Sequence, residues 1–528
     1  MPIRIRKDKS TGNKRSNRRR SSNNQSSFKG NRSGGGIASM LMPLAISLFK
    51  KNPKLVLILV VVGALFYFLG GTKMCSTEDG NADNMNIASL FSRGLDMDEQ
   101  VYDKAEVFEP LADNVKNPMP ESISLLKYCP PRKNQGQQGS CVGWASGYAA
   151  RTILFSKATG EKAKHVAFSP SFVYNQIALK DCQGTYLQRA MELMYTTGAL
   201  PFSKFAYNEY DCGKQPTSSQ KNQANKYRTK GFNRLSKSGD NYSVDLLALK
   251  QNLAQGAPVV IGMMVGGTFM SKMNGRDLWT PSNKDYDARG FGGHAMCVIG
   301  YDDYKTDQEG AFQIMNSWGE KWGNKGVFWI RYSDFEHFTK EAYGLYPMGD
   351  AEKFSSNILD AKIGLVKTKN GQTIPIKYTG SNTFKTKKPI AIDTDFKVEI
   401  TNSMECYVYI LGEESDQSSY VLFPYTKKHS PYCGITGTRV FPRDYSLFPD
   451  EKGSQDYVAI IVSKQKLDFT KLNTAVNNAK GRTYAEKVNN TLKDELVPNI
   501  KFSGNGYAEF SAETLNKNAV AVILEIRK

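Results

Sequence analysis

Histidine is scarce in this chain, and its scarcity limits the chemistry that the sequence can carry. The 528 residues include only His165, His294, His337 and His429, which are scattered along the chain. The sequence also lacks a C-x-x-C pair and an H-E-x-x-H motif, two arrangements that are typical of zinc sites. We therefore expect no metal and no cofactor.

Acidic residues are almost absent from the N-terminal part. Residues 1–54 hold 14 lysines and arginines but a single acid, Asp8, so 13 of the 19 net positive charges lie there. Up to residue 36 the tail is rich in Ser, Asn and Gly and shows no apolar periodicity, which predicts a disordered basic tail over residues 1–36. No aromatic residues interleave with its basic cluster at residues 14–20, and this disfavours a nucleic-acid partner.

The chain has one long apolar run without charge. Residues 55–71 read LVLILVVVGALFYFLGG, which is near the lower length limit for a transmembrane helix. Before it, residues 37–54 are partly apolar and interrupted by Pro43, which predicts an amphipathic pre-anchor segment. The basic excess ahead of the run predicts a cytoplasmic N-terminus and an extracytoplasmic location, periplasmic or at the cell surface, for the rest of the chain. Residues 72–125 are polar and acidic, and we predict a tether there, with at most one short helix near residues 84–93.

A cysteine in the stretch Asn134–Ala150, NQGQQGSCVGWASGYAA, is the first candidate for catalysis. From Cys141 onward, apolar residues recur at helical spacing, so we expect a helix that begins at Ser140 or Cys141 with Ser140 as its N-cap. A cysteine in the first turn of a helix faces the positive end of the helix dipole, which favours the nucleophilic thiolate.

Two further residues could assist this cysteine. His294 lies between Gly292-Gly293 and an apolar β run, and Asn316 follows a second strand-like run ahead of Trp318. Asn316 could accept the imidazole N–H and fix the tautomer, while Trp318 would exclude water from that bond. Taken singly, however, such a histidine is more often a core residue and such an asparagine an ordinary turn residue.

In combination these residues resemble the papain-like cysteine protease family, in a bacterial branch. The family pattern is C-G-[SA]-C-[WY], with His and Asn about 130–150 residues downstream; here the separations from Cys141 are 153 and 175 residues. The resemblance implies that Cys141 is the nucleophile, His294 the base, Asn316 the residue that orients it, and Gln135 the oxyanion donor. It also implies a shielding role for Trp318.

The same resemblance implies substrate contacts and shows departures from the pattern. Gly184, Gly262, Ala295 and Trp318 are the implied substrate-binding residues, and the small residues Gly262 and Ala295 would leave a roomy apolar pocket. Gln138 replaces the cysteine three positions before the nucleophile, so the disulfide usual there cannot form. Val142 replaces the aromatic that normally follows the nucleophile, and Thr185 stands where the family has a second glycine.

Seven cysteines remain besides Cys141. An extracytoplasmic location permits disulfides, and the pairs that we would test are Cys182–Cys212 and Cys406–Cys433. Cys297 lies within an apolar strand pattern and is expected to be a buried thiol. The polar, lysine-rich stretch of residues 216–242 is expected to be a surface loop.

The pattern changes after about residue 350. Strand-like runs at residues 396–400, 407–411, 420–423, 457–462 and 519–526 predict a β-rich, sandwich-like domain, and helical patterns at 469–480 and 483–492 predict a helical insertion. Residues 407–423 resemble a domain of unknown function from bacterial surface and secreted proteins. This domain contains no defensible acid–base set, so it is either a module that binds an unknown protein or surface partner, or a scaffold.

The whole chain is thus predicted to be an α+β protein with a papain-like two-lobe fold, one lobe helical and the other a β-barrel, flanked by an N-terminal transmembrane helix and a C-terminal sandwich-like domain. The predicted function is membrane-anchored hydrolysis of peptide bonds in polypeptides through a thioester. Two alternatives stay open: a catalytically retired binding protein, and an acyl-transfer or transglutaminase-like enzyme. The expected parts are a tail (1–36), a pre-anchor segment (37–54), a transmembrane helix (55–71), a tether (72–125), a peptidase domain (126–350) and an accessory domain (351–528).

Overall fold

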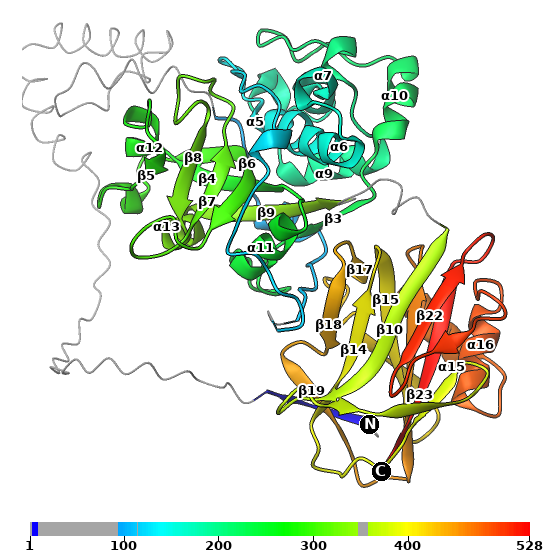
Figure 1. Cartoon of the computed structure of the whole chain (residues 1–528). Helices are drawn as coiled ribbons and strands as arrows, with labels where there is room; N and C mark the ends of the chain where they lie inside the picture. The colour runs from blue at the N-terminus through cyan, green and yellow to red at the C-terminus, as the bar shows by residue number, and fades with distance from the viewer. Residues whose placement is uncertain (1–2, 9–92, 113–114, 347–356) are drawn as a thin grey trace, which may run out of the picture. The chain divides into compact units, whose positions relative to one another are not determined.

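The computed structural model describes residues 3–8, 93–112, 115–346 and 357–528 (Figure 1). The predicted pre-anchor segment, the predicted transmembrane helix, Cys75 and most of the predicted basic tail lie outside these residues. Among the helices that are described, none has the length and apolar character needed to cross a membrane.

Helices dominate the chain from the candidate nucleophile to residue 227. A helical stretch begins at Cys141 as α5, continues as the π-helix η3 and ends as α6, whose C-cap Gly160 has a φ of +74°. The apolar positions that predicted this helix, Val142, Ala145, Ala149 and Ala150 among them, are all buried. The helices here are α5 (Cys141–Gly143), η3 (Trp144–Arg151), α6 (Thr152–Thr159), α7 (Ala163–Val166), α8 (Pro170–Tyr174), α9 (Leu187–Thr196) and α10 (Ser218–Ala224).

A mostly antiparallel sheet packs against these helices. Its pairing order is β3-β9-β4-β6-β7-β8-β5, with β2 added beside β6. The strands are β2 (Ser122–Ser124), β3 (Gly231–Arg234), β4 (Val259–Val265), β5 (Leu278–Trp279), β6 (Gly292–Asp302), β7 (Ala311–Met315), β8 (Val327–Arg331) and β9 (Thr339–Tyr346), and the helices beside them are α11 (Leu246–Ala254), α12 (Gly267–Ser271) and α13 (Tyr332–Phe338).

This sheet carries the second half of the candidate site. The long apolar run after His294 forms β6, and β4 pairs with it so that Gly262 faces Ala295 and Met263 faces His294. Helix η3 packs against β4 and β6, which brings the cysteine-bearing helix and the histidine-bearing strand together. Within the described residues, the pairing order does not close from β5 back to β3, so the predicted barrel is an open sheet.

The C-terminal residues form two sheets that face each other across a shared apolar core. Every strand-like run predicted here lies in a strand, and the two predicted helices are α15 (Phe469–Asn478) and α16 (Tyr484–Leu492). These helices cover the outer face of the sheet that contains β15, β20 and β23. The first sheet contains β10 (Ile358–Lys367), β11 (Thr373–Ile374), β14 (Phe396–Asn402), β18 (Gly437–Phe441), β19 (Tyr445–Pro449), β21 (Phe502–Ser503) and β22 (Ala508–Glu513); the second contains β12 (Ile376–Gly380), β13 (Thr383–Thr386), β15 (Cys406–Glu413), β16 (Ser419–Phe423), β17 (Tyr432–Cys433), β20 (Gln455–Ser463) and β23 (Ala519–Arg527).

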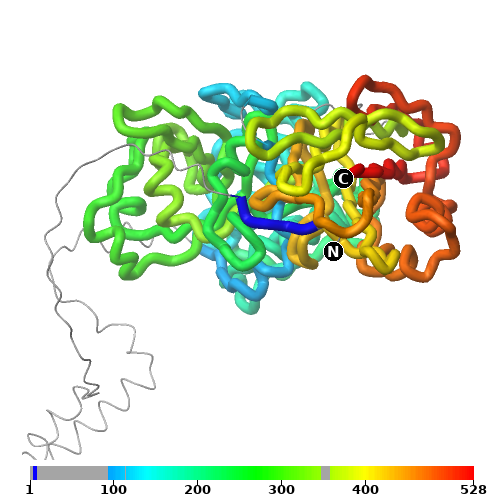
Figure 2. Tube along the Cα trace, turned by 90° about the horizontal axis from the view of Figure 1, so that it is seen from below, coloured from blue at the N-terminus to red at the C-terminus, as the bar shows by residue number. Residues whose placement is uncertain are grey.

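Residues 3–8 correct the prediction of a disordered tail for the part of that tail that the structure describes. Strand β1 (Ile3–Lys7) pairs antiparallel with β19, and Figure 2 shows this blue segment along an orange one. Asp8 then accepts a bond of 2.6 Å from the ammonium group of Lys397. The alternation of Ile and Arg in residues 3–6 is a short strand signal that the composition of the whole tail concealed.

Residues 93–112 and 115–125 are packed on the protein and do not form a free tether. The apolar residues of this segment looked too sparse for folded structure, yet Leu95, Tyr102, Phe108 and Leu111 are buried. The segment contains α4 (Glu99–Tyr102), and β2 at its end pairs with β6. These apolar side chains are buried by residues that lie far away in the sequence. A local sequence pattern cannot predict such contacts.

The predicted surface loop at residues 216–242 contains helix α10, strand β3 and a fully buried arginine. The guanidinium group of Arg234 lies over the rings of Tyr102 and Tyr242 and 3.2 Å from a carboxylate oxygen of Asp103. Its charge is therefore neutralised inside the fold, which is the condition under which arginine can be buried.

The structure confirms one of the two predicted disulfide bonds. Cys182 and Cys212 form a disulfide, and Cys297 is a buried free thiol, both as predicted. Cys406 and Cys433 are free thiols, so the predicted cross-link between them is absent. Pairing of β15 with β17 does place the two residues opposite each other.

Candidate active site

The candidate nucleophile lies at the first turn of its helix, as the sequence predicts. Cys141 is the first residue of α5, and its thiol lies beside the backbone N–H groups of Gly94, Cys141, Val142 and Ala295. These amides lower the pKa of the thiol, but complete burial outweighs them and raises the pKa of Cys141 to about 11. Burial thus favours the protonated thiol in the closed site, whereas the position at the helix start favours the thiolate.

Ser140 precedes the helix but does not cap it. Its side chain makes no capping bond to the helix backbone and bonds the hydroxyl of Tyr207 at 2.7 Å. The residue type suggested a cap because serine often serves there, whereas a tyrosine from a distant loop is the partner that the fold supplies.

His294 and Asn316 lie in hydrogen-bond contact. His294 Nε2 is 2.8 Å from Asn316 Oδ1, an atom that also accepts the N–H of Ser317. Because an amide oxygen can only accept, the imidazole proton is on Nε2 and Nδ1 is the basic nitrogen. Nδ1 is buried and makes no hydrogen bond within the described residues.

Trp318 covers this pair. Its ring stacks on the imidazole of His294, with ring centres 4.5 Å apart and an angle of 27° between the planes. Burial lowers the pKa of His294 to about 4, although the bond to Asn316 acts in the opposite direction. The imidazole is therefore neutral in this closed site. Trp318 was also expected to bind substrate, and in the structure it is buried against His294.

Gln135 ties the cysteine loop to the asparagine loop. Its Oε1 accepts the hydroxyl of Ser317 at 2.6 Å, and its Nε2 donates to the carbonyl of Gln138 at 3.0 Å. Its backbone N–H donates to the carbonyl of Ser317 at 2.8 Å. Gln135 precedes the nucleophile by six residues in the sequence. In the structure it is bonded to Ser317, the residue that follows Asn316.

An extended segment, Arg93–Asp96, lies across the candidate site. Thr185 donates its N–H to Gly94 O at 3.0 Å, Asp96 donates to Thr185 O at 3.1 Å, and Leu95 donates to Gly293 O at 3.2 Å. Since the amide of Gly94 also lies beside the thiol of Cys141, this segment closes the site. Sequence reasoning missed it, because its own residues give no signal of where they bind.

Gly184 and Gly262, two of the predicted substrate-binding residues, lie against the segment Arg93–Asp96. A Cβ on Gly184, whose φ is +127°, would lie 2.5 Å from Gly94 O, and a Cβ on Gly262 would lie 2.7 Å from Cδ2 of Leu95. Leu187 and Glu341 border the same space, and Ala295 faces Gly262 across the strand pair. The expected apolar pocket is therefore occupied by Leu95.

Glu341 is an unexpected member of this pocket. It is buried, and burial together with the charge of Asp98 raises its pKa to about 8. A buried carboxyl group without an opposite charge is best accommodated in its neutral form. No local motif marks this residue, since it lies within the ordinary strand pattern of β9.

Comparison with known proteins gives one family. Residues 120–348 match the family described as "Papain family cysteine protease". Over 214 residues the chain is 29% identical to cathepsin K of Mus musculus, covering 39% of this chain and 58% of that protein. It is 25% identical over 224 residues to an uncharacterized peptidase C1-like protein of Acanthamoeba polyphaga mimivirus, covering 40% of this chain and 66% of that protein.

The match therefore spans less than two thirds of the length of either relative. Among solved structures, xylellain, a cysteine protease from Xylella fastidiosa, is 21% identical, with a TM-score of 0.40 over 49% of this chain and 97% of that one.

Proposed function

Residues 120–348 belong to the papain family of cysteine proteases, and from this premise we propose that the chain hydrolyses peptide bonds in polypeptides with Cys141 as its nucleophile. The observation that carries the proposal is the bond from His294 Nε2 to Asn316 Oδ1. This bond leaves Nδ1 as the base on a residue whose neighbour, Ala295, has its amide beside the thiol of Cys141. Asn316 is then the orienting residue, and Trp318 keeps water from the bond.

The reaction follows from these positions. His294 Nδ1 takes the thiol proton while the sulfur attacks the carbonyl carbon, which forms the C–S bond. The C–N bond then breaks, and the proton on Nδ1 passes to the departing amine. In the second half, Nδ1 takes a proton from water, the hydroxide attacks the thioester, and the C–S bond breaks to release the carboxylic acid and restore the thiol.

The negative charge on the carbonyl oxygen needs donors that are in place before the reaction. We assign the backbone N–H of Cys141 and the side-chain amide of Gln135 to this task, because both groups belong to one short loop. Removing one such donor typically lowers the rate by about 10²–10³-fold. The hydroxyl of Ser317 donates to Oε1 of Gln135 and holds its amide, while the backbone N–H of Gln135 donates to the carbonyl of Ser317.

Peptide hydrolysis requires the segment Arg93–Asp96 to leave the site. In the closed arrangement the thiol and imidazole are both neutral, since burial raises the pKa of Cys141 and lowers that of His294. Admission of water relieves both shifts and favours transfer of the proton from sulfur to Nδ1. We infer that the closed chain is a latent form of the enzyme.

The occupied pocket indicates the substrate. The side chain of Leu95 lies against Gly262, with Leu187 bordering the same space, so a polypeptide with a leucine-sized apolar residue would place that side chain there. Thr185, which bonds the backbone of the segment, is then a backbone partner of the substrate, and Gly184, which lies against Gly94 O, leaves room for the substrate backbone.

The proposal is tested by labelling the full-length chain with a peptidyl epoxide and locating the adduct by mass spectrometry. We expect Cys141 to be labelled and a Cys141→Ala chain to remain unmodified there. A parallel assay with a peptide substrate, in the presence and absence of an added amine, separates hydrolysis from acyl transfer. The proposal is overturned if Cys141 stays unlabelled in a folded chain from which the segment has been released by Gly94→Ala.

Anchoring in a membrane through residues 55–71, with the peptidase outside the cytoplasm, is also proposed. Its support is the uncharged run and the basic excess before it. The pairing of β1 with β19 competes with this topology, since one span would separate residues 3–7 from the C-terminal domain. Membrane fractionation, together with protease access to tags at the two ends, tests both the anchor and the side on which each end lies.

A further inference from the structure

One tyrosine joins the two ends of the loop that carries the proposed oxyanion donors. The hydroxyl of Tyr207 is 2.6 Å from the carbonyl oxygen of Gln135 and 2.7 Å from the hydroxyl of Ser140. Because a carbonyl can only accept, the single proton of Tyr207 goes to Gln135, and Ser140 must donate to Tyr207. A directed chain of bonds thus links the residue before the nucleophile to the proposed oxyanion glutamine.

The neighbours of Tyr207 hold the middle of the same loop. Glu209 Oε2 accepts the N–H of Gln137 at 2.9 Å, and Asn208 O accepts from Nε2 of Gln138 at 3.3 Å. Residues 207–209 therefore bond to residues 135, 137, 138 and 140. The ring of Tyr207 also packs edge-on against Trp144, with centres 4.8 Å apart, which fixes the direction in which its hydroxyl points.

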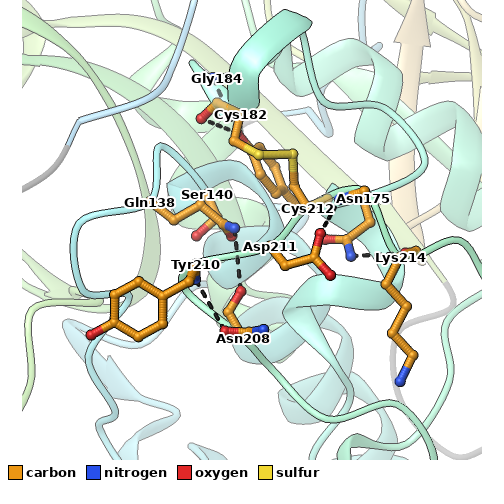
Figure 3. The surroundings of a disulfide bond; sticks show 12 residues. Gln138, Ser140, Asn175, Cys182, Gly184, Asn208, Tyr210, Asp211, Cys212 and Lys214 are labelled. Atoms are coloured by element: carbon orange, nitrogen blue, oxygen red, sulfur yellow. Dashed lines mark hydrogen bonds between the residues drawn. A yellow bond between two sulfur atoms is a disulfide. The ribbon is translucent and has the colours of Figure 1, made fainter.

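A disulfide anchors residues 207–209 to the candidate substrate site. Cys212 is bonded to Cys182, whose carbonyl accepts the hydroxyl of Tyr174, and that hydroxyl in turn accepts the N–H of Gly184 (Figure 3). Figure 3 shows Ser140 and Gln138 in the surroundings of this disulfide and marks the bond from Gln138 to Asn208. The loop at 207–209 and Gly184, which borders the candidate site, are thus both held close to one covalent link.

We propose that Tyr207 is a positioning residue for the peptidase proposed above: it holds the donors of the oxyanion site through Gln135 and Ser140. The inference rests on that proposed function. Ser317 fixes Gln135 from the side of Asn316, and Tyr207 fixes it from the opposite loop. A donor must lie about 2.7–3.1 Å from the developing oxyanion, so loss of one of these two supports weakens transition-state binding more than substrate binding.

The matched test compares Tyr207→Phe with Tyr210→Phe in the full-length chain, each with and without Gly94→Ala. Tyr210 lies three residues away with its ring exposed, so its variant removes a hydroxyl from the same segment without touching the chain of bonds. We expect Tyr207→Phe to lower kcat about 10-fold while KM changes less than about twofold, and Tyr210→Phe to leave both unchanged.

Two further measurements separate positioning from general damage. The affinity of a peptide aldehyde, whose adduct carries an oxygen in the oxyanion site, should fall in Tyr207→Phe by the same factor as kcat. The rate of Cys141 alkylation by iodoacetamide needs no oxyanion donor and should stay within about twofold. Ser140→Ala keeps the bond from Tyr207 to Gln135 and should show a smaller fall in kcat than Tyr207→Phe.

The inference is overturned if Tyr207→Phe behaves like Tyr210→Phe, or if alkylation and aldehyde affinity fall together, because the residue would then act through the nucleophile or the fold. If a folded Gly94→Ala chain neither hydrolyses peptides nor binds the aldehyde, the proposed function itself fails and the inference fails with it.

Discussion

Gly94 lies so close to Gly139 that a Cβ on residue 94 would lie 2.0 Å from the carbonyl oxygen of residue 139. The same Cβ would be 2.3 Å from the carbonyl carbon and 2.4 Å from the α-carbon, all of them backbone atoms that cannot rotate away. Gly139 precedes the nucleophile by two residues. Closure of the site therefore depends on the absence of a side chain at residue 94.

We predict that Gly94→Ala opens the site. The added methyl group overlaps the backbone of Gly139, so the segment Arg93–Asp96 cannot keep its bonds to Thr185 and Gly293. Epoxide labelling of Cys141 should then be at least about 10-fold faster than in the parent chain, which corresponds to a loss of at least about 1.4 kcal/mol of closure free energy. Gly364→Ala, whose Cβ would meet only Tyr507 at 3.6 Å, is the control and should label at the parent rate. Equal rates for the two variants would show that the segment does not limit access.

We predict that closure weakens as the pH rises. Burial raises the pKa of Glu341 from 4.5 to about 8, so the closed form binds this proton more tightly than an open form does. The contribution of Glu341 to closure is complete below about pH 4.5 and is lost as the pH rises through about 8.

The test is the labelling rate of Cys141 as a function of pH, divided by the rate for Glu341→Gln. The glutamine cannot ionise, so the ratio removes the titration of the thiol itself and should increase toward high pH. Glu451→Gln changes an exposed residue and should give a flat ratio to the parent. A flat ratio for Glu341→Gln as well would contradict the role given to this carboxyl group.

We predict that Asn316→Ala lowers kcat by about 10²-fold, the lower end of what acid–base catalysis contributes. Without its bond to Asn316, the imidazole of His294 can place its proton on Nδ1, where it cannot accept the proton of the thiol. Steady-state kinetics on a peptide substrate measure the effect in the Gly94→Ala chain, where the site is open, with Asn370→Ala in an exposed turn as the control. A fall in KM alone, with kcat intact, would place Asn316 outside the chemistry.

Local motifs predicted the elements of the site, and long-range packing decided whether it is open. Glycines before an apolar run were enough to place His294 on β6, and helical spacing was enough to begin a helix at Cys141, since both patterns are complete within about ten residues. The pKa shifts of Cys141 and His294 could not be predicted from local motifs, because they arise from burial by residues far away in the chain, among them Gly94, almost fifty residues before the cysteine. The roles of Leu95 and Glu341 could not be predicted for the same reason. The pocket that contains both residues is built from strands and helices that lie far apart in the chain.

We predict that loss of the disulfide destabilises the peptidase domain. The link between Cys182 and Cys212 closes a loop across 30 residues of sequence, for which chain entropy gives about 3–4 kcal/mol of stability. Denaturant unfolding of a Cys182→Ser/Cys212→Ser chain should show a loss of this size, and reductant should lower the stability of the parent chain but not of the variant. An equal response of both chains to reductant would contradict this.

The pairing of β1 with β19 leads to a last prediction, which also decides the topology. Asp8 accepts bonds from the buried ammonium group of Lys397 and from the hydroxyl of Ser446, both on strands of the C-terminal domain. Asp8→Ala leaves the charge of Lys397 without its carboxylate and should cost about 1–3 kcal/mol of unfolding free energy. Glu451→Ala removes an exposed carboxylate of the same domain and should cost nothing measurable.

The measurement is denaturant unfolding of the full-length chain in detergent and in membranes. If residues 3–8 and the C-terminal domain share one side of the membrane, Asp8→Ala destabilises the domain in both settings, and tags at the two ends are cut by the same added protease. If the N-terminus is cytoplasmic and the domain is outside, the variant is silent in membranes and only one tag is cut. In that case β1 cannot pair with β19 in the cell, because a single span cannot bring the two strands to the same side.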